Sequence, residues 1–158
     1  MKTLIFGLVF MIGAFNIKAQ ELKPIGFEQL NGFQDKEKKL VIVFIETDWC
    51  KYCKAMKQTI LNYKPVSDRL KNNFYTVVLN AEEKRNIDFA GKVFKFMPTG
   101  VNTGFHQLAE QLGNINGQIS YPALCILNDL NEIIYQYQGY LDSKSIIKML
   151  DIISKANP

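Results

Sequence analysis

Residues 40–54, LVIVFIETDWCKYCK, are the part of this 158-residue chain that decides its fold. The first six are continuously apolar and rich in β-branched side chains, which is typical of a strand buried on both faces of a sheet. The polar residues 46–48 predict a turn, and a helix is expected to start at about Cys50. Cys50 and Cys53 are therefore expected one turn apart at a helix N-terminus, which favours a redox-active pair.

The rest of the chain predicts an alternation of helices and strands. Helices are expected at residues 26–39, from Cys50 to just before Pro65, at 106–112 and at 141–154, and further strands at 74–79, 123–127 and 132–137. Residues 87–96 alternate apolar and polar side chains around Ala90-Gly91, which predicts a short hairpin, and residues 98–104 are expected to form a loop. The cysteines fall where the first strand meets the next helix.

The N-terminus has the pattern of a secretory signal. A lysine follows Met1, residues 4–15 are apolar, and Ala19 is a small residue at which cleavage is expected. This run is shorter than the roughly 20 residues that span a bilayer. A signal peptide at 1–19, a single domain at 20–158 and a periplasmic location are therefore expected, with an uncleaved anchor or a buried helix as alternatives.

The net charge argues against two classes of partner. The chain carries +4, which falls to +2 without the signal because that segment holds two lysines and no acid. This excess is too small to indicate binding to nucleic acid or to a membrane surface.

Two motifs together resemble the thioredoxin family. The WCxxC sequence at Trp49–Cys53 follows the first core strand, with Lys54 and Met56 completing a form seen in secreted thioredoxin-like proteins, and Tyr121-Pro122 precedes a later strand. The resemblance implies a thioredoxin-like α/β fold, in which helices flank a central mixed sheet. It also implies that Pro122 is cis and faces the cysteines across a substrate groove. Residues 80–105 have no counterpart in a minimal thioredoxin and are expected to form an insertion between the second core strand and the following helix.

The resemblance assigns roles to the two cysteines. Cys50 would be the nucleophile, because a helix N-terminus and the positive charges of Lys51 and Lys54 stabilise a thiolate whose ordinary pKa is about 8.5. Cys53 would be more buried and would attack the mixed disulfide second.

Neighbouring residues are expected to shape the same site. Trp49 would shield the pair, and the backbone of Tyr121, beside Pro122, would bind an extended substrate strand. Lys51 and Tyr52 separate the cysteines in place of the Gly-Pro of typical thioredoxins, which leaves the direction of electron flow open.

The buried acid of the family is not at its usual position in this chain. Thioredoxins carry a buried acid on the first core strand, where this chain has Phe44. Glu46, two residues later, is a candidate to replace it, and a solvated turn residue is the alternative.

Cys125 and His106 are outside both motifs. Cys125, in the apolar run 123–127, is expected to be a buried small hydrophobic residue, with a resolving or metal-binding role as the alternative. His106, the single histidine, is expected to cap or pack a helix, with a proton shuttle as the alternative. A tetrahedral zinc site needs four ligands, and these two residues do not form a second motif, so no metal site is expected.

The chain is therefore predicted to be an exported thiol–disulfide oxidoreductase, most simply a reductase. Its substrates would be proteins or small thiols and disulfides. No bound cofactor is expected because the dithiol holds the electrons, and a membrane electron donor would keep a monomeric protein reduced. The alternatives are an oxidase or isomerase, a non-catalytic binding module with an inert disulfide, and a metal chaperone.

Overall fold

The computed structural model describes residues 22–157, so the predicted signal peptide and its cleavage position lie outside the described residues. The elements follow in the order α1 (Phe27–Gln34), β1 (Leu40–Glu46), α2 (Lys51–Asn62), α3 (Lys64–Asn73), β2 (Phe74–Asn80), β3 (Ile87–Phe89), β4 (Lys92–Phe94), β5 (Phe96–Pro98), β6 (Gly104–His106), α4 (Gln107–Gly113), β7 (Ala123–Leu127), β8 (Ile133–Gln138) and α5 (Ser143–Ala156). No helix within residues 22–157 combines the length and apolar character needed to cross a bilayer.

The main sheet is mixed and has the strand order β2-β1-β7-β8. β1 runs parallel to β2, from the pair Leu40–Phe74 to the pair Glu46–Asn80. β7 is antiparallel to both β1 and β8. All seven residues of β1 are buried, as expected for a central strand whose two faces are both covered. The predicted mixed sheet with flanking helices is confirmed.

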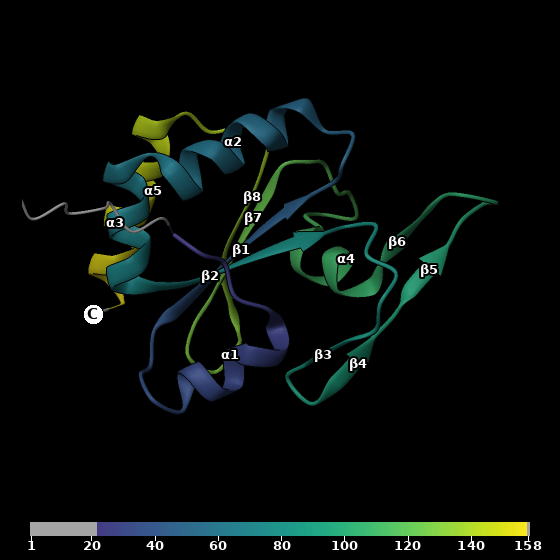
Figure 1. Ribbon diagram of the computed structural model, residues 1–158, viewed down its shortest axis with the longest axis horizontal. Coiled ribbons are helices and arrows are strands. Elements are labelled where there is room, and N and C mark those ends of the chain that lie inside the picture. The colour runs from purple at the N-terminus through teal and green to yellow at the C-terminus, as the bar shows by residue number, and fades with distance from the viewer. Residues whose placement is uncertain (1–21, 158) are drawn as a thin grey trace, which may run out of the picture.

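Helices cover both faces of this sheet, as Figure 1 shows. Alternate side chains of β1 point to opposite faces. Leu40, Ile42 and Phe44 join a core cluster with residues of α2, α3 and α5. Val41, Val43 and Ile45 join a second cluster with residues of α1, β3, β4 and α4.

The predicted helix at residues 26–39 is too long, because α1 ends at Gln34. The segment between α2 and β2 was expected to contain no helix, but α3 spans it. Pro65 does end the preceding helix, yet it also occupies the first turn of the next one, where its missing N–H costs no hydrogen bond. Val66 and Leu70, four residues apart, are the buried apolar residues of α3.

Residues between β2 and α4 form the predicted insertion. β3 and β4 make the expected hairpin, with positive φ angles at Ala90 (51°) and Gly91 (73°) in its turn. The expected loop at 98–104 is confirmed at residues 99–103. It connects two short strands that were not predicted, β5 and β6, which pair from Phe96–His106 to Pro98–Gly104 and form a second hairpin.

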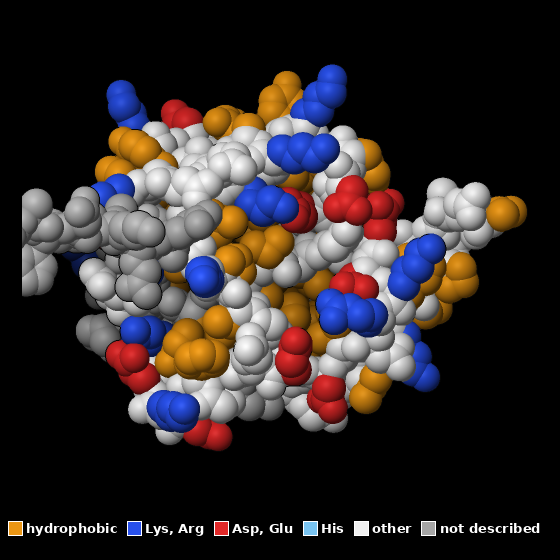
Figure 2. Space-filling model, viewed as in Figure 1, with side chains coloured by type: hydrophobic (Ala, Val, Ile, Leu, Met, Phe, Trp, Pro, Cys, Tyr) orange, Lys and Arg blue, Asp and Glu red, His pale blue; other side chains and the backbone are white. Residues whose placement is uncertain are grey.

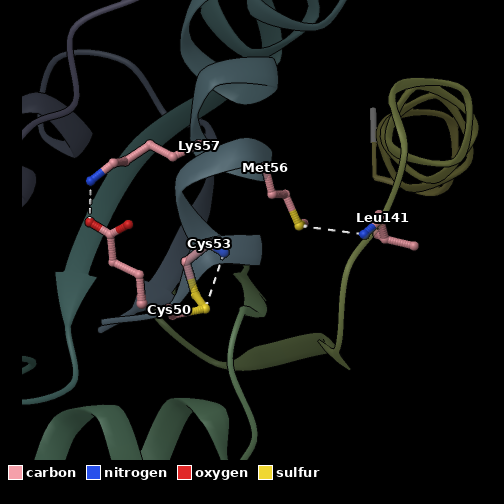
Figure 3. The surroundings of a disulfide bond; sticks show 6 residues. Cys50, Cys53, Met56, Lys57 and Leu141 are labelled. Atoms are coloured by element: carbon pink, nitrogen blue, oxygen red, sulfur yellow. Dashed lines mark hydrogen bonds and ion pairs between the residues drawn. A yellow bond between two sulfur atoms is a disulfide. The ribbon is translucent and has the colours of Figure 1, made fainter. Parts of the chain in front are cut away.

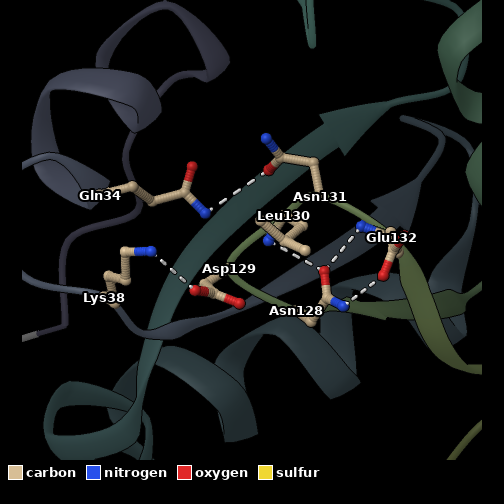
Figure 4. A network of polar contacts seen from close by, with 7 residues as sticks. All are labelled: Gln34, Lys38, Asn128, Asp129, Leu130, Asn131 and Glu132. Carbon is tan, nitrogen blue, oxygen red and sulfur yellow. Dashed lines mark hydrogen bonds and ion pairs between the residues drawn. The ribbon is translucent and has the colours of Figure 1, made fainter.

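At the other end of the sheet, polar side chains hold the β7–β8 turn (Figure 4). The side-chain oxygen of Asn128 accepts the N–H groups of Leu130 and Glu132, at 3.0 and 2.9 Å. Lys38, after α1, pairs with Asp129 at 3.2 Å. This end is therefore closed by a side-chain network, while the cysteines lie at the opposite end.

Candidate active site

The two cysteines lie where β1 turns into α2, and they are joined by a disulfide (Figure 3). Their sulfur atoms are 2.08 Å apart and their Cα atoms 5.2 Å apart. Cys50 is the N-cap of α2, and its sulfur accepts the backbone N–H of Cys53 at 3.1 Å. Because the first N–H groups of a helix have no partners within it, they favour a negatively charged sulfur at this position.

The two sulfur environments differ as expected. Cys50 is 6% exposed and Cys53 is completely buried. Lys51 and Lys54 are both exposed on the first turns of α2, and neither forms an ion pair with any residue between 22 and 157. Cys50 is therefore the more accessible residue of the pair, with two lysines nearby in sequence.

Tyr121 and Pro122 lie beside the cysteine loop. The peptide bond between them is cis. Ile45 of β1 pairs with Ala123 of β7 in antiparallel register, so Glu46 and Pro122 are each one residue beyond this pair. Pro122 accepts the N–H of Gly139 at 2.8 Å, which joins the segment before α5 to the same region.

Two aromatic pairs flank the motif. Trp49, which is 67% exposed, meets Tyr121 edge-on with ring centroids 6.3 Å apart. Tyr52, which is 68% exposed, lies 6.0 Å from the ring of Tyr140. Burial, with added repulsion from nearby carboxylates, raises the pKa of Tyr121 to about 12, so its phenol stays neutral.

Tyr140 was missed by sequence reasoning. It follows Gly139, whose φ is 111°, in the connection between the last strand and the last helix. The sequence signal was this Gly-Tyr pair in a turn, but only the fold places it near Tyr52.

Glu46 is not a solvated turn residue. It is the last residue of β1, and its side chain is only 9% exposed. Its carboxylate pairs with Lys57 of α2, which the sequence reading also missed. Lys57 lies four residues after Cys53 and therefore on the same side of the helix. Phe44 is 1% exposed and belongs to the core on the α2 side of the sheet.

Cys125 and His106 have the structural roles expected of them. Burial raises the pKa of the Cys125 thiol to about 12, so it is an inert hydrophobic residue. His106 is the N-cap of α4, where its Nδ1 accepts the N–H of Leu108 at 3.2 Å. Its Nε2 lies 3.1 Å from the carbonyl oxygen of Arg85, which assigns the proton to Nε2, and burial lowers its pKa. Among residues 22–157, no three potential metal ligands are grouped together.

Comparison with known proteins identifies the family. The family model of a thioredoxin-like domain matches residues 27–153, and the chain belongs to this family. No curated protein matched the sequence significantly.

Solved structures share the fold at low sequence identity. A thioredoxin-fold protein from Helicobacter pylori is 20% identical, with a TM-score of 0.57 over 74% of this chain and 70% of its own. A disulphide isomerase from Xylella fastidiosa Temecula1 is 15% identical, with a TM-score of 0.54 over 80% of this chain and 86% of its own. DsbH oxidoreductase is 12% identical, with a TM-score of 0.61 over 94% and 95%. The thioredoxin-like fold and its CxxC disulfide support thiol–disulfide oxidoreductase chemistry.

Proposed function

We propose that this protein is an exported thiol–disulfide oxidoreductase that reduces disulfides with the Cys50–Cys53 dithiol. The observation that carries the proposal is the position of the Cys50 sulfur. It caps the N-terminus of α2 and accepts a backbone N–H there. That environment stabilises a thiolate, which is the reactive form of cysteine.

The reaction consists of two exchanges. The Cys50 thiolate attacks one sulfur of a substrate disulfide, forming a mixed disulfide and releasing the other substrate sulfur as a thiolate that takes a proton. Cys53 then loses its proton and attacks the Cys50 sulfur, which releases the second substrate thiol and forms the Cys50–Cys53 disulfide. Two electrons and two protons pass to the substrate, and no bound cofactor takes part.

Glu46 is our candidate to accept the proton of Cys53. It is buried at the end of β1, directly before the loop that leads to Cys50, and Lys57 keeps its charge paired. In this role Glu46 replaces the acid that other thioredoxins carry at the position of Phe44.

The substrate would bind across the aromatic pairs. Pro122 has no N–H, and the neighbouring backbone of Tyr121 is suited to pair with an extended strand that carries the disulfide. Trp49 on one side and Tyr52 on the other supply exposed aromatic surface.

The cycle needs an external donor. After each turnover the protein holds a disulfide, so a dithiol donor, such as a membrane electron-transfer protein, must reduce it again. Export, which rests on the signal pattern at residues 1–19, would place this cycle in an oxidising compartment, where such a donor is required.

The reduction potential of the Cys50–Cys53 pair tests the direction. The purified protein is equilibrated with mixtures of reduced and oxidised dithiothreitol, and the free thiols are counted by alkylation and mass spectrometry. A reduction potential of about −270 mV supports a reductase, and one of about −120 mV supports an oxidase.

Catalysed insulin reduction tests the activity itself. We expect Cys50→Ser to abolish it, whereas Cys125→Ala, a matched change outside the site, should retain it. A stable disulfide without catalysis would refute the enzyme in favour of a binding module.

A further inference from the structure

The insertion is tied to the loop that holds the cysteines. The N–H of Ala81 donates to the carbonyl oxygen of Glu46, and the N–H of His106 donates to the carbonyl oxygen of Ala81, both at 2.7 Å. The indole N–H of Trp49 donates to Glu82 at 3.1 Å. Both ends of the insertion therefore meet at the carboxyl end of β1, next to the candidate site.

The second inserted hairpin, β5–β6, projects from the body of the protein, as Figure 1 shows. Val101 at its tip is fully exposed, and Met97 is 40% exposed. Figure 2 shows hydrophobic side chains along this projection and at its end. Exposed apolar residues on a projecting element cannot contribute to the protein's own core, and such surfaces mark interaction sites.

The β5–β6 hairpin has a specific packing requirement. A Cβ atom added to Gly104 would lie 2.3 Å from the ring of Phe96, so a glycine is needed for this ring to lie over β6. The ammonium of Lys84 is 6.0 Å from the centre of the same ring, within the range of a cation–π contact. This packing gives the arm a defined direction relative to the site.

The insertion carries exposed lysines that have no acidic partner. Residues 80–106 contain four Lys or Arg residues and three Asp or Glu residues, and one of these pairs is closed by the 2.8 Å contact between Arg85 and Glu83. Lys92 and Lys95 are exposed, and neither pairs with an acid among the described residues. A complementary partner would present apolar side chains next to negative charge.

We propose that the β5–β6 hairpin, with Lys95 directly before β5 and Lys92 at the start of β4, is a docking arm for acidic polypeptides that carry the disulfide to be reduced. This inference rests on the proposed function and adds a substrate class to it. The arm would hold a region of the substrate outside the groove, while the Tyr121-Pro122 segment holds the part around the disulfide. A small disulfide would reach Cys50 without touching the arm.

Attachment to the site favours a polypeptide over an anionic membrane as the partner. Through Ala81 and Glu82 the arm is joined to Glu46 and Trp49, so a molecule bound to it is held beside the disulfide. A polypeptide can contact both surfaces at once, and the two contacts then reinforce each other.

Binding without turnover is the first test. The probe is a fluorescent peptide of about 20 residues with two serines in place of its cysteines and Asp, Glu and Leu elsewhere. We expect Lys92→Glu/Lys95→Glu to raise its Kd about tenfold in fluorescence anisotropy, and Val101→Asp to raise it about fivefold. Lys144→Glu/Lys155→Glu, the same charge change on α5, should leave the Kd unchanged. Equal Kd values for all the variants would overturn the docking arm, whatever the catalytic result.

Turnover separates this inference from the function on which it rests. With the disulfide form of the peptide, the arm variants should lose about tenfold in kcat/KM, but with bis(2-hydroxyethyl) disulfide they should match the parent protein. Equal losses on both substrates would overturn the arm, and no turnover of either would refute the proposed function while the Kd values still decide the arm.

Two further measurements test other binding partners for the arm. Sedimentation with vesicles of phosphatidylcholine and phosphatidylglycerol, abolished by Lys92→Glu/Lys95→Glu, would replace the polypeptide with a membrane. Dimerisation abolished by Val101→Asp, measured by light scattering, would replace it with a second copy of this chain.

Discussion

The face of the sheet covered by α2, α3 and α5 is a continuous helical layer that includes the disulfide, whereas the opposite face is shared by α1, α4 and the first inserted hairpin. Cysteines lie on both sides. Cys50 and Cys53 belong to the helical layer at the end of β1, while Cys125 lies within β7 and belongs to the opposite cluster. We expect position relative to a helix N-terminus to decide which of these three thiols is reactive.

Thiol reactivity should show the largest difference between the two faces. In the reduced native protein at pH 7, iodoacetamide should modify Cys50 at least about 1,000 times faster than Cys125, whose pKa near 12 leaves almost no thiolate. Quenched alkylation followed by peptide mass spectrometry measures both rates in one sample. Comparable rates in folded protein would show that the Cys125 strand opens readily, and labelling in denaturant is the control for intrinsic reactivity.

Truncating one buried phenylalanine on each face compares how much the two faces contribute to stability. Phe44 is 1% exposed in the helical layer, and Phe89 in the insertion is 4% exposed, with its ring 5.0 Å from that of Phe27. Phe44→Ala should lower the free energy of unfolding by about 3–5 kcal/mol. Phe89→Ala should cost about 1–3 kcal/mol, because a short surface hairpin can relax around the lost ring. Urea unfolding followed by circular dichroism gives both values, and equal costs would make the insertion an integral part of the core.

The Glu46–Lys57 pair joins the central strand to the helical layer. Lys57→Met should lower the free energy of unfolding by about 1–3 kcal/mol, because it leaves a buried carboxylate without its partner. Adding Glu46→Gln should recover part of this loss. A double-mutant cycle from urea unfolding measures the coupling. Strictly additive costs would mean that the two charges do not interact in solution.

His106, which lies at the end of the insertion, should make a small pH-dependent contribution to the free energy of unfolding. Its pKa is lowered in the folded state by burial, so the unfolded chain takes up the proton first as pH falls. The full contribution to stability is present above the unfolded pKa of about 6.5 and is lost as pH falls from there through the folded pKa, by at most about 1.4 kcal/mol per pH unit. His106→Asn keeps an N-cap acceptor and should flatten the stability curve between pH 7 and pH 5. A curve as steep as that of the parent protein would assign the effect to other groups.

Local sequence patterns predicted most of the fold. Three of the four main strands were found because each is a largely apolar run, and β8, whose residues are exposed or half-buried, was found because a turn joins it to β7. The CxxC helix was found because its cysteines follow closely on a strand. α3 was missed because Pro65 was interpreted only as the end of a helix, although proline is equally suited to the first turn of the next one. β5 and β6 were missed because each is only three residues long and residues 99–103 separate them, so their pairing comes from contact between strands and not from a repeating pattern.

What the sequence determined by itself was the chemistry and its place in the chain: two cysteines at a strand–helix junction, and a Tyr-Pro step before a later strand. These are local features, and the preferences of a helix N-terminus and of proline act over a few residues. Only the tertiary structure decided that Glu46 is buried against Lys57, that Tyr140 meets Tyr52, and that the insertion is anchored beside Trp49. Each of these contacts joins residues from different elements, and its existence depends on how strands pair and helices pack, which no short stretch of sequence encodes alone.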